Sequence, residues 1–384
     1  MVVVGGLMAA LTVRCVRVVA GYRAVCSALF ARRQIPRVPW MTNDCGRRFL
    51  LSEEYLGLKV FQNRIYLLNN FNIDKSKFMN YIDDKITKDK VILKSELLTL
   101  LHSCETEEDV QHLCRTVRRY HKNNDGSNQE FNFGSVLMRL LYIKGLHKEA
   151  LDLIMDPELV LFFNFASYHI LVDFLFEKKY YEDALNVISV MESRGWKSSS
   201  ITNFLKCGIY YKLNTPEAYK SCLTLMEKIL QEREKTPRRM ICFAIALALQ
   251  QDDMEKARTF FDIVDNKETT LCFNLQLLML SKMGNFDEVL THLAALALQE
   301  TGRKFMKRVS SEVLTAVHLL MSNDEVTCQR LDHIYRNLVN VKLITHTSLD
   351  LLLLSSFPRK SLEPEHIHAQ RDRFHNVEAE LVAD

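Results

Sequence analysis

The sequence predicts an all-α fold in which helical hairpins stack into a right-handed superhelical solenoid. Glycine and proline are scarce, with 12 and 7 among 384 residues, whereas an all-β fold needs both residues for its many tight turns. Long stretches rich in Leu, Glu, Lys, Ala and Met carry apolar residues at helical spacing. A similar segment also returns about every 34 residues, as is typical of solenoids.

An acidic residue or pair followed by Ala or Val marks each repeat. The repeated small residues lie 40, 34, 34, 39 and 32 positions apart, and they are Val110, Ala150, Ala184, Ala218, Ala257 and Val289. An apolar helix precedes each mark, and a second helix begins at the acidic residues, whose negative charge suits a helix N-terminus. A short polar break, often with glycine, separates the two helices. Each unit is therefore expected to be a helical hairpin.

Stacking is expected because a lone hairpin of this size cannot bury its apolar residues on both sides. The first and last hairpins are the least regular, as capping units are. The expected hairpins lie near 93–122, 131–157, 165–195, 201–233, 238–264, 270–298 and 310–340.

The N-terminal segment has the composition of a mitochondrial transit peptide. Residues 1–43 contain six arginines but no lysine and no acidic residue, and the first carboxylate is Asp44. A secretory signal is the competing interpretation, because residues 1–11 are apolar. In a secretory signal, however, the positive charges precede the apolar run, whereas here they follow it. We therefore expect residues 1–45 to be a transit peptide and the protein to reside in the mitochondrial matrix.

Removal of this segment changes the charge of the protein. Residues 1–48 hold eight arginines and one aspartate, a net charge of +7, so the rest of the chain carries 3 − 7 = −4. Any contact with nucleic acid must then use local basic patches.

Catalytic and metal-binding motifs are not apparent. The ten cysteines are scattered without a CxxC pair, so buried free thiols are expected. His366, His368 and His375 lack the Cys or carboxylate partners that would complete a metal site. No Gly-rich phosphate loop or serine nucleophile elbow occurs. We expect a non-enzymatic protein without cofactor, metal, small-molecule substrate or membrane span.

Two repeat families have units of about this length. Tetratricopeptide units need small residues 12 positions before and 7 positions after the repeated Ala, where this chain has Val172 and Met191. The segment from Ala166 to Lys197 instead resembles a pentatricopeptide repeat without gaps. The residues in register with that family are Tyr168, Leu171, Asp173, Leu175, Ala184, Leu185, Met191, Gly195 and Lys197.

The resemblance covers about 110–300 well or fairly and the rest by extension, and it defines the expected organisation. The fold would be a solenoid of pentatricopeptide-type hairpins. The expected parts are 1–45 as transit peptide, 46–92 as N-terminal helical cap, 93–340 as pentatricopeptide-like repeat array, and 341–384 as C-terminal helix and polar tail.

Pentatricopeptide proteins are mostly organellar RNA-binding factors, which agrees with the predicted transit peptide. The resemblance implies that two residues per repeat select a base. These are Ser135 with Asn164, and His169 with Ser199. His169 departs from the usual Asn, Ser or Thr, so its repeat is expected either to stack on a base or to make no contact. The alternative for both pairs is that they are ordinary helix-start residues.

Three basic clusters are candidates for phosphate contact, which requires local positive charge. They are Arg115, Arg118 and Arg119; Arg238 and Arg239; and Lys304, Lys307 and Arg308. Solvated helix faces carry such runs as well.

The resemblance implies a mitochondrial RNA-binding protein that acts in the maturation, processing or stability of transcripts and supports the respiratory chain. Its partners would be single-stranded mitochondrial RNA, held in the concave groove, and RNA-processing enzymes or the mitochondrial ribosome. The alternative is a structural or assembly protein of the mitochondrial ribosome, which degenerate repeats and a slightly acidic chain favour.

Overall fold

The computed structural model describes residues 50–69, 75–123, 133–232, 236–298, 307–322 and 324–354. The expected transit peptide, the candidate Lys304 and the polar tail beyond residue 354 lie outside these ranges. The division of the chain into cap, array and tail stays a prediction.

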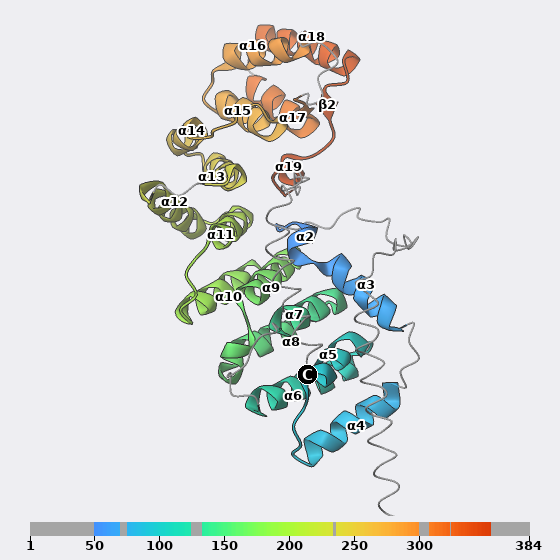
Figure 1. Cartoon of the computed structure of the whole chain (residues 1–384). Coiled ribbons are helices and arrows are strands. Elements are labelled where there is room, and N and C mark those ends of the chain that lie inside the picture. The colour runs from blue at the N-terminus through green and yellow to red at the C-terminus, as the bar shows by residue number, and fades with distance from the viewer. Residues whose placement is uncertain are drawn as a thin grey trace, which may run out of the picture.

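The chain folds as a solenoid of paired α-helices (Figure 1), which confirms the predicted all-α class. Among the described residues, three helices precede the array: α2 (Glu53–Leu56), α3 (Leu58–Asn69) and α4 (Lys75–Thr87). The first hairpins are α5 (Lys94–Ser103) with α6 (Glu107–Asn123), α7 (Phe133–Lys144) with α8 (His147–Met155), and α9 (Phe165–Glu177) with α10 (Tyr181–Ser193). A 3-10 helix, η2 (Pro157–Phe162), joins α8 to α9.

The array continues with α11 (Ser200–Leu213) and α12 (Pro216–Gln231), α13 (Arg238–Gln250) and α14 (Met254–Asp262), α15 (Thr270–Lys282) and α16 (Phe286–Ala297), and α17 (Ser311–Met321) and α18 (Glu325–Asn340). Helix α19 (Leu349–Leu354) follows, at the end of the described residues. Two short strands, β1 (Val309–Ser310) and β2 (Ile344–Thr345), pair in parallel around α17 and α18.

The repeated small residues occupy equivalent places in successive hairpins. Each is the fourth residue of a second helix, except Ala218, which is the third residue of α12. All are buried, and none is more than 6% exposed. A large side chain at this position would push the first helix away, because protein interiors are close-packed. The period seen in the sequence is therefore the period of helix pairing.

A residue with left-handed backbone ends the first helix of successive hairpins. These residues are Gly145, Lys179, Asn214, Asp252 and Gly284, with φ between 48° and 79°. At Lys179 the reversal brings Tyr180 N–H to Leu175 O, 2.9 Å away, which satisfies a carbonyl at the end of α9. The short polar breaks of the sequence are therefore tight helix–helix turns.

First and second helices form two separate layers. Neighbouring first helices from α5 to α17 pack against one another, and α8 packs on α10 as α16 does on α18. Figure 1 shows a curved stack whose concave side is lined by the first helices. Helix α3 packs on α5 and α7, and α19 packs on α13 and α15, on that same side. The helices before and after the array therefore cover its concave surface.

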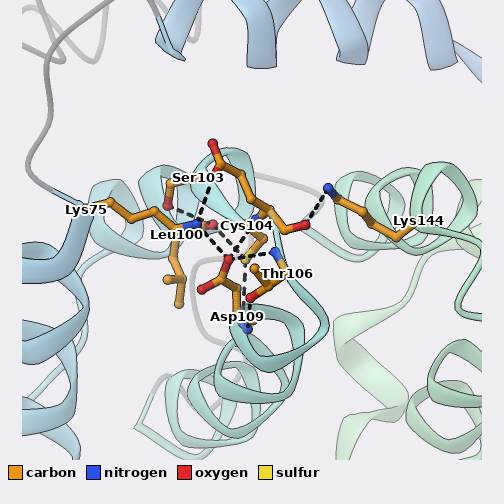
Figure 2. A network of polar contacts seen from close by, with 8 residues as sticks. Lys75, Leu100, Ser103, Cys104, Thr106, Asp109 and Lys144 are labelled. Atoms are coloured by element: carbon orange, nitrogen blue, oxygen red, sulfur yellow. Dashed lines mark hydrogen bonds and ion pairs between the residues drawn. The ribbon is translucent and has the colours of Figure 1, made fainter.

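A polar network fixes the start of the array (Figure 2). Asp109, in the first turn of α6, accepts hydrogen bonds from the backbone N–H groups of Glu105 and Thr106, each at 2.8 Å. Lys75 Nζ of α4 lies 2.7 Å from the same carboxylate, and Lys144 Nζ of α7 donates to Glu105 O at 2.9 Å. Burial acts to raise the pKa of Asp109, but these hydrogen bonds outweigh it and hold the pKa at about 2. The network joins three helices at one turn.

The left-handed turns offer a direct test of the hairpin geometry. A side chain crowds the backbone at the φ of 67° that Lys179 adopts. We expect Lys179→Gly to raise the free energy of unfolding by about 0.5–1 kcal/mol. Lys178→Gly is the matched control, because Lys178 has right-handed backbone and glycine there only loses entropy. Urea unfolding followed by circular dichroism measures both, and equal effects would contradict this turn geometry.

Candidate nucleic-acid interface

Residues 50–57, called the N-terminal strap below, are bound to the concave side by a buried carboxylate. The backbone N–H groups of Leu50 and Leu51 both donate to Asp173 Oδ1 at 2.9 Å. Tyr142 Oη donates to the other oxygen at 3.1 Å. Asp173 has no exposed surface, and burial raises its pKa to about 7, although the three hydrogen bonds oppose that shift. The carboxylate links the strap to α9 and α7.

Two further contacts hold the strap across neighbouring helices. Arg139 Nε, from α7, donates to Leu56 O at 2.6 Å. Gly57 ends α2 with left-handed backbone, and a Cβ there would lie 3.3 Å from Arg139 Nε. Gly208 of α11 leaves room for Leu50, whose Cδ2 would be 2.7 Å from an added Cβ. The strap therefore lies on α7, α9 and α11.

His169 is enclosed by the strap and by the next repeat. Tyr55 Oη lies 2.7 Å from its Nδ1, and Thr202 Oγ1 lies 2.9 Å from its Nε2. Burial lowers the pKa of His169 to about 4, so the ring is neutral at physiological pH. Both ring nitrogens have partners within the chain. This arrangement fits the expectation that the His169 repeat makes no base contact.

The other three candidates for base contact also have partners in the fold. Ser135 is buried, and Arg139 Nη1 lies 3.5 Å from its hydroxyl. Asn164 caps α9 by accepting from Ser167 N–H at 3.0 Å. Ser199 caps α11 by accepting from Thr202 N–H at 3.2 Å. Asn164 and Ser199 are only partly buried, whereas Ser135 and His169 are inside the protein.

Helix α19 covers the concave side farther along the array. Arg239 Nη2 donates to Leu353 O at 2.7 Å, and its guanidinium lies 5.2 Å from the Phe204 ring centroid. Burial lowers the pKa of Arg239 to about 10. Asp350 forms an ion pair with Lys212 of α11. Arg239 therefore anchors α19 and is not placed to meet a phosphate.

The structure thus differs from the expected open groove. The strap and α19 lie where a polynucleotide was expected, because first helices present apolar side chains to the concave side. Leu50, Leu56 and Leu353 fill that side and are at most 1% exposed. Burial of such apolar surface favours the covered state.

The first basic cluster lies on the outer layer. Arg115 is exposed on α6, Arg118 Nε lies 3.0 Å from Asp156 Oδ2, and Arg119 forms an ion pair with Asp89. Because α6 is a second helix, this cluster does not share a face with the base-contact candidates.

Several other candidates meet at one edge of the array, called the helix-start edge below. It consists of the N-termini of α9, α11, α13, α15 and α17. Hydrogen bonds join two pairs of neighbouring helix starts. His169 of α9 bonds to Thr202 of α11, and Asn274 Nδ2 of α15 donates to Arg308 O, just before α17, at 2.9 Å. The candidates on this edge are Asn164, Ser199, Arg238, Lys307 and Arg308. Of these, Lys307 forms an ion pair with Glu268, whereas Arg308 is exposed.

Neither a membrane helix nor a metal cluster is found in the described ranges. No helix there is both long and apolar enough to cross a membrane. No three His, Cys, Asp or Glu side chains of these residues gather as metal ligands do.

Paired helices with a buried alanine or valine near the start of successive second helices define a helical-hairpin repeat protein. No family model matches the chain. It is 37% identical over 317 residues to pentatricopeptide repeat-containing protein 2, mitochondrial, of Danio rerio, covering 82% of this chain and 83% of that protein. The corresponding proteins of Xenopus laevis and Homo sapiens are 35% and 36% identical, over 333 and 313 residues. They cover 85% and 80% of this chain, and 86% and 80% of their own lengths.

The chain therefore belongs to the family of pentatricopeptide repeat-containing protein 2, mitochondrial. Both the predicted repeat family and the mitochondrial location are confirmed.

The buried carboxylate under the strap predicts an unusual pH dependence. The folded pKa of Asp173, about 7, lies above the ordinary value of 3.8. Its contribution to stability is therefore greatest below pH 3.8 and falls as the pH rises to about 7. Asp173→Asn keeps an oxygen acceptor but cannot ionise, so we expect it to lose this pH dependence and to be at least as stable as the wild type at pH 8.

Asp173→Ala is the contrasting variant, because it leaves the N–H groups of Leu50 and Leu51 unpaired. We expect it to be about 2–4 kcal/mol less stable than the Asn variant at every pH, because neither variant titrates at this position. Urea unfolding at pH 5 and pH 8 distinguishes the three proteins. Parallel pH profiles for the wild type and the Asn variant would show that Asp173 does not titrate in this way.

Proposed function

We propose that the chain is a non-enzymatic RNA-binding protein of the mitochondrial matrix. It acts in the maturation, processing or stability of mitochondrial transcripts, alone or with RNA-processing enzymes, and through them supports the respiratory chain. The family relationship makes an RNA-related role the first choice. The observation that carries the proposal is the helix-start edge, where the N-termini of the first helices follow one another and Arg238, Lys307 and Arg308 lie near the starts of α13 and α17.

The helix-start edge has the chemistry that a phosphodiester chain requires. Each helix N-terminus presents N–H groups and a partial positive charge to an anion. Arg238 adds a full charge at the first residue of α13, and Arg308 adds one directly before β1, three residues ahead of α17. Packed helices lie about 8–10 Å apart, so the edge offers anchor points at regular spacing along a single strand.

Base contacts are limited to the candidates that remain partly exposed. Asn164 and Ser199 follow one another on the edge and carry groups that hydrogen-bond a base. Ser135 and His169 lie beneath the strap and take no part. We therefore propose that the strand follows the helix-start edge, with most of its affinity from phosphates, and not the centre of the concave side.

The second candidate function is a structural or assembly role in the mitochondrial ribosome. The filled concave side favours it, because the chain's own segments occupy the surface that base reading would use. In that case the partner is ribosomal RNA or a ribosomal protein, and the purified chain has little preference for free single strands.

The proposal predicts that charge on the helix-start edge sets RNA affinity. Arg238→Gln combined with Arg308→Gln is expected to weaken binding of a mixed-sequence single-stranded RNA on the order of tenfold, because two charged phosphate contacts are lost. The slope of log affinity against log salt should fall by about 1.4 in size, since each contact on a single strand contributes about 0.7. Fluorescence anisotropy of a labelled strand measures both quantities.

Arg258→Gln combined with Arg336→Gln is the matched control, because both arginines are exposed on second helices, α14 and α18. The control pair should leave the affinity and the salt slope unchanged. Equal losses in the two double variants would refute the edge as the binding surface. Failure of the wild type to bind, with cosedimentation with a ribosomal subunit, would favour the structural role.

A further inference from the structure

Two buried cysteines face each other between neighbouring first helices. Cys242 is the fifth residue of α13 and Cys272 the third residue of α15, and their Sγ atoms are 3.8 Å apart. Each is at most 1% exposed. A disulfide bond is about 2.05 Å long, so the sulfurs need to approach by only about 1.8 Å.

The surroundings give the two thiols different chemistry. The hydrogen bond between the two thiols is the main cause that lowers the pKa of Cys272 to about 6, although burial opposes it. The Thr269 hydroxyl and the charges of Arg238 and Lys267 add to that lowering. The same contact, together with burial, raises the pKa of Cys242. Cys272 is therefore the nucleophile of the pair, because the thiolate is the reactive form.

A thin cover separates Cys272 from solvent. The connection from α14 to α15 passes over the pair, with Asn266 O 3.8 Å from Cys272 Sγ. The side chains of Asp265, Asn266 and Glu268 on this connection are exposed. A segment with few buried contacts opens at low free energy. Local opening of the connection admits a small oxidant without unfolding α13 or α15.

We propose that Cys242 and Cys272 form a peroxide-sensitive dithiol site that closes into an intramolecular disulfide. The Cys272 thiolate attacks one oxygen of a hydroperoxide, the O–O bond breaks, and water or an alcohol leaves after taking up a proton. Cys272 is then a sulfenic acid. The Cys242 sulfur attacks it, the S–S bond forms, and the S–O bond breaks to release water. The peroxide is reduced, and two thiols are oxidised to one disulfide.

The disulfide joins two repeats of the solenoid. Its cysteines are 30 residues apart in the sequence, and they lie in the second turn of α13 and the first turn of α15. The link fixes the starts of α13 and α15 relative to each other, next to Arg238 on the helix-start edge. The inference does not depend on RNA binding.

A second pair of cysteines supplies a control within the same chain. Cys207 of α11 is buried and hydrogen-bonds to Cys222 of α12. That contact and burial raise the pKa of Cys207. Both cysteines lie in the middle of their helices, away from a connection such as the one from α14 to α15 that lies next to Cys272. This pair is therefore expected to stay reduced.

The test treats the reduced full-length chain with hydrogen peroxide, quenches it, and alkylates the remaining thiols in denaturant before peptide mass analysis. We expect a linked Cys242–Cys272 peptide, about 2 Da lighter than the two thiol peptides and restored by dithiothreitol, while Cys207 and Cys222 are alkylated. Equal oxidation of both pairs, or a Cys242–Cys272 pair that stays fully alkylated, would overturn the proposal.

Two variants separate the roles of the thiols. In Cys272→Ser, Cys242 should stay reduced. In Cys242→Ser, Cys272 should stop at the sulfenic acid, which dimedone traps. Trapping of Cys242 instead of Cys272 would reverse the assignment and contradict the proposal. Unchanged thermal unfolding of each reduced variant confirms that the comparison is between folded proteins.

Discussion

The architecture depends on one packing constraint: each second helix from α6 to α16 buries an alanine or valine in its first turn, where it packs against the neighbouring helices. The six residues at this position are buried and set the distance between paired helices. Because each hairpin has apolar residues on both sides, it is stable only between neighbours. Two buried clusters result, and α15 contributes to both, with Leu275 in one and Leu277 in the other. The core is thus continuous along the array.

A single row of first helices leaves apolar surface exposed on the concave side. The strap and α19, from opposite ends of the described chain, cover that surface. In each case a charged side chain of the array bonds to the backbone of the covering segment. Asp173 accepts from the strap, and Arg239 donates to α19. The cost is a buried carboxylate and a partly buried guanidinium. Burial raises the pKa of Asp173 and lowers the pKa of Arg239, and both shifts disfavour the charged form. Covering this side leaves the helix-start edge as the accessible row of repeated groups.

The hairpins could be predicted from the sequence, because helices form through contacts between residues close in sequence. The spacing of Ala150, Ala184 and Ala218 also gives the repeat period. The family followed from the same register. The strap could not be predicted, because its contact with Asp173 joins segments 123 residues apart that share no pattern. An aspartate inside an otherwise apolar helix was the one available sign. The contacts of Arg119 and Arg239 could not be predicted either, because their partners Asp89 and Leu353 belong to other parts of the chain.

The long reach of the strap has a consequence for the order in which the chain assembles. Hairpins use contacts between residues close in sequence, which form quickly, whereas contacts over long separations form slowly. Tyr55 and Leu50 meet their partners 114 and 123 residues later. The earliest described segment is thus among the last to find its place. Until α9 has formed, the apolar side chains of the strap stay exposed to solvent. A nascent or newly translocated chain must be protected from aggregation during that interval.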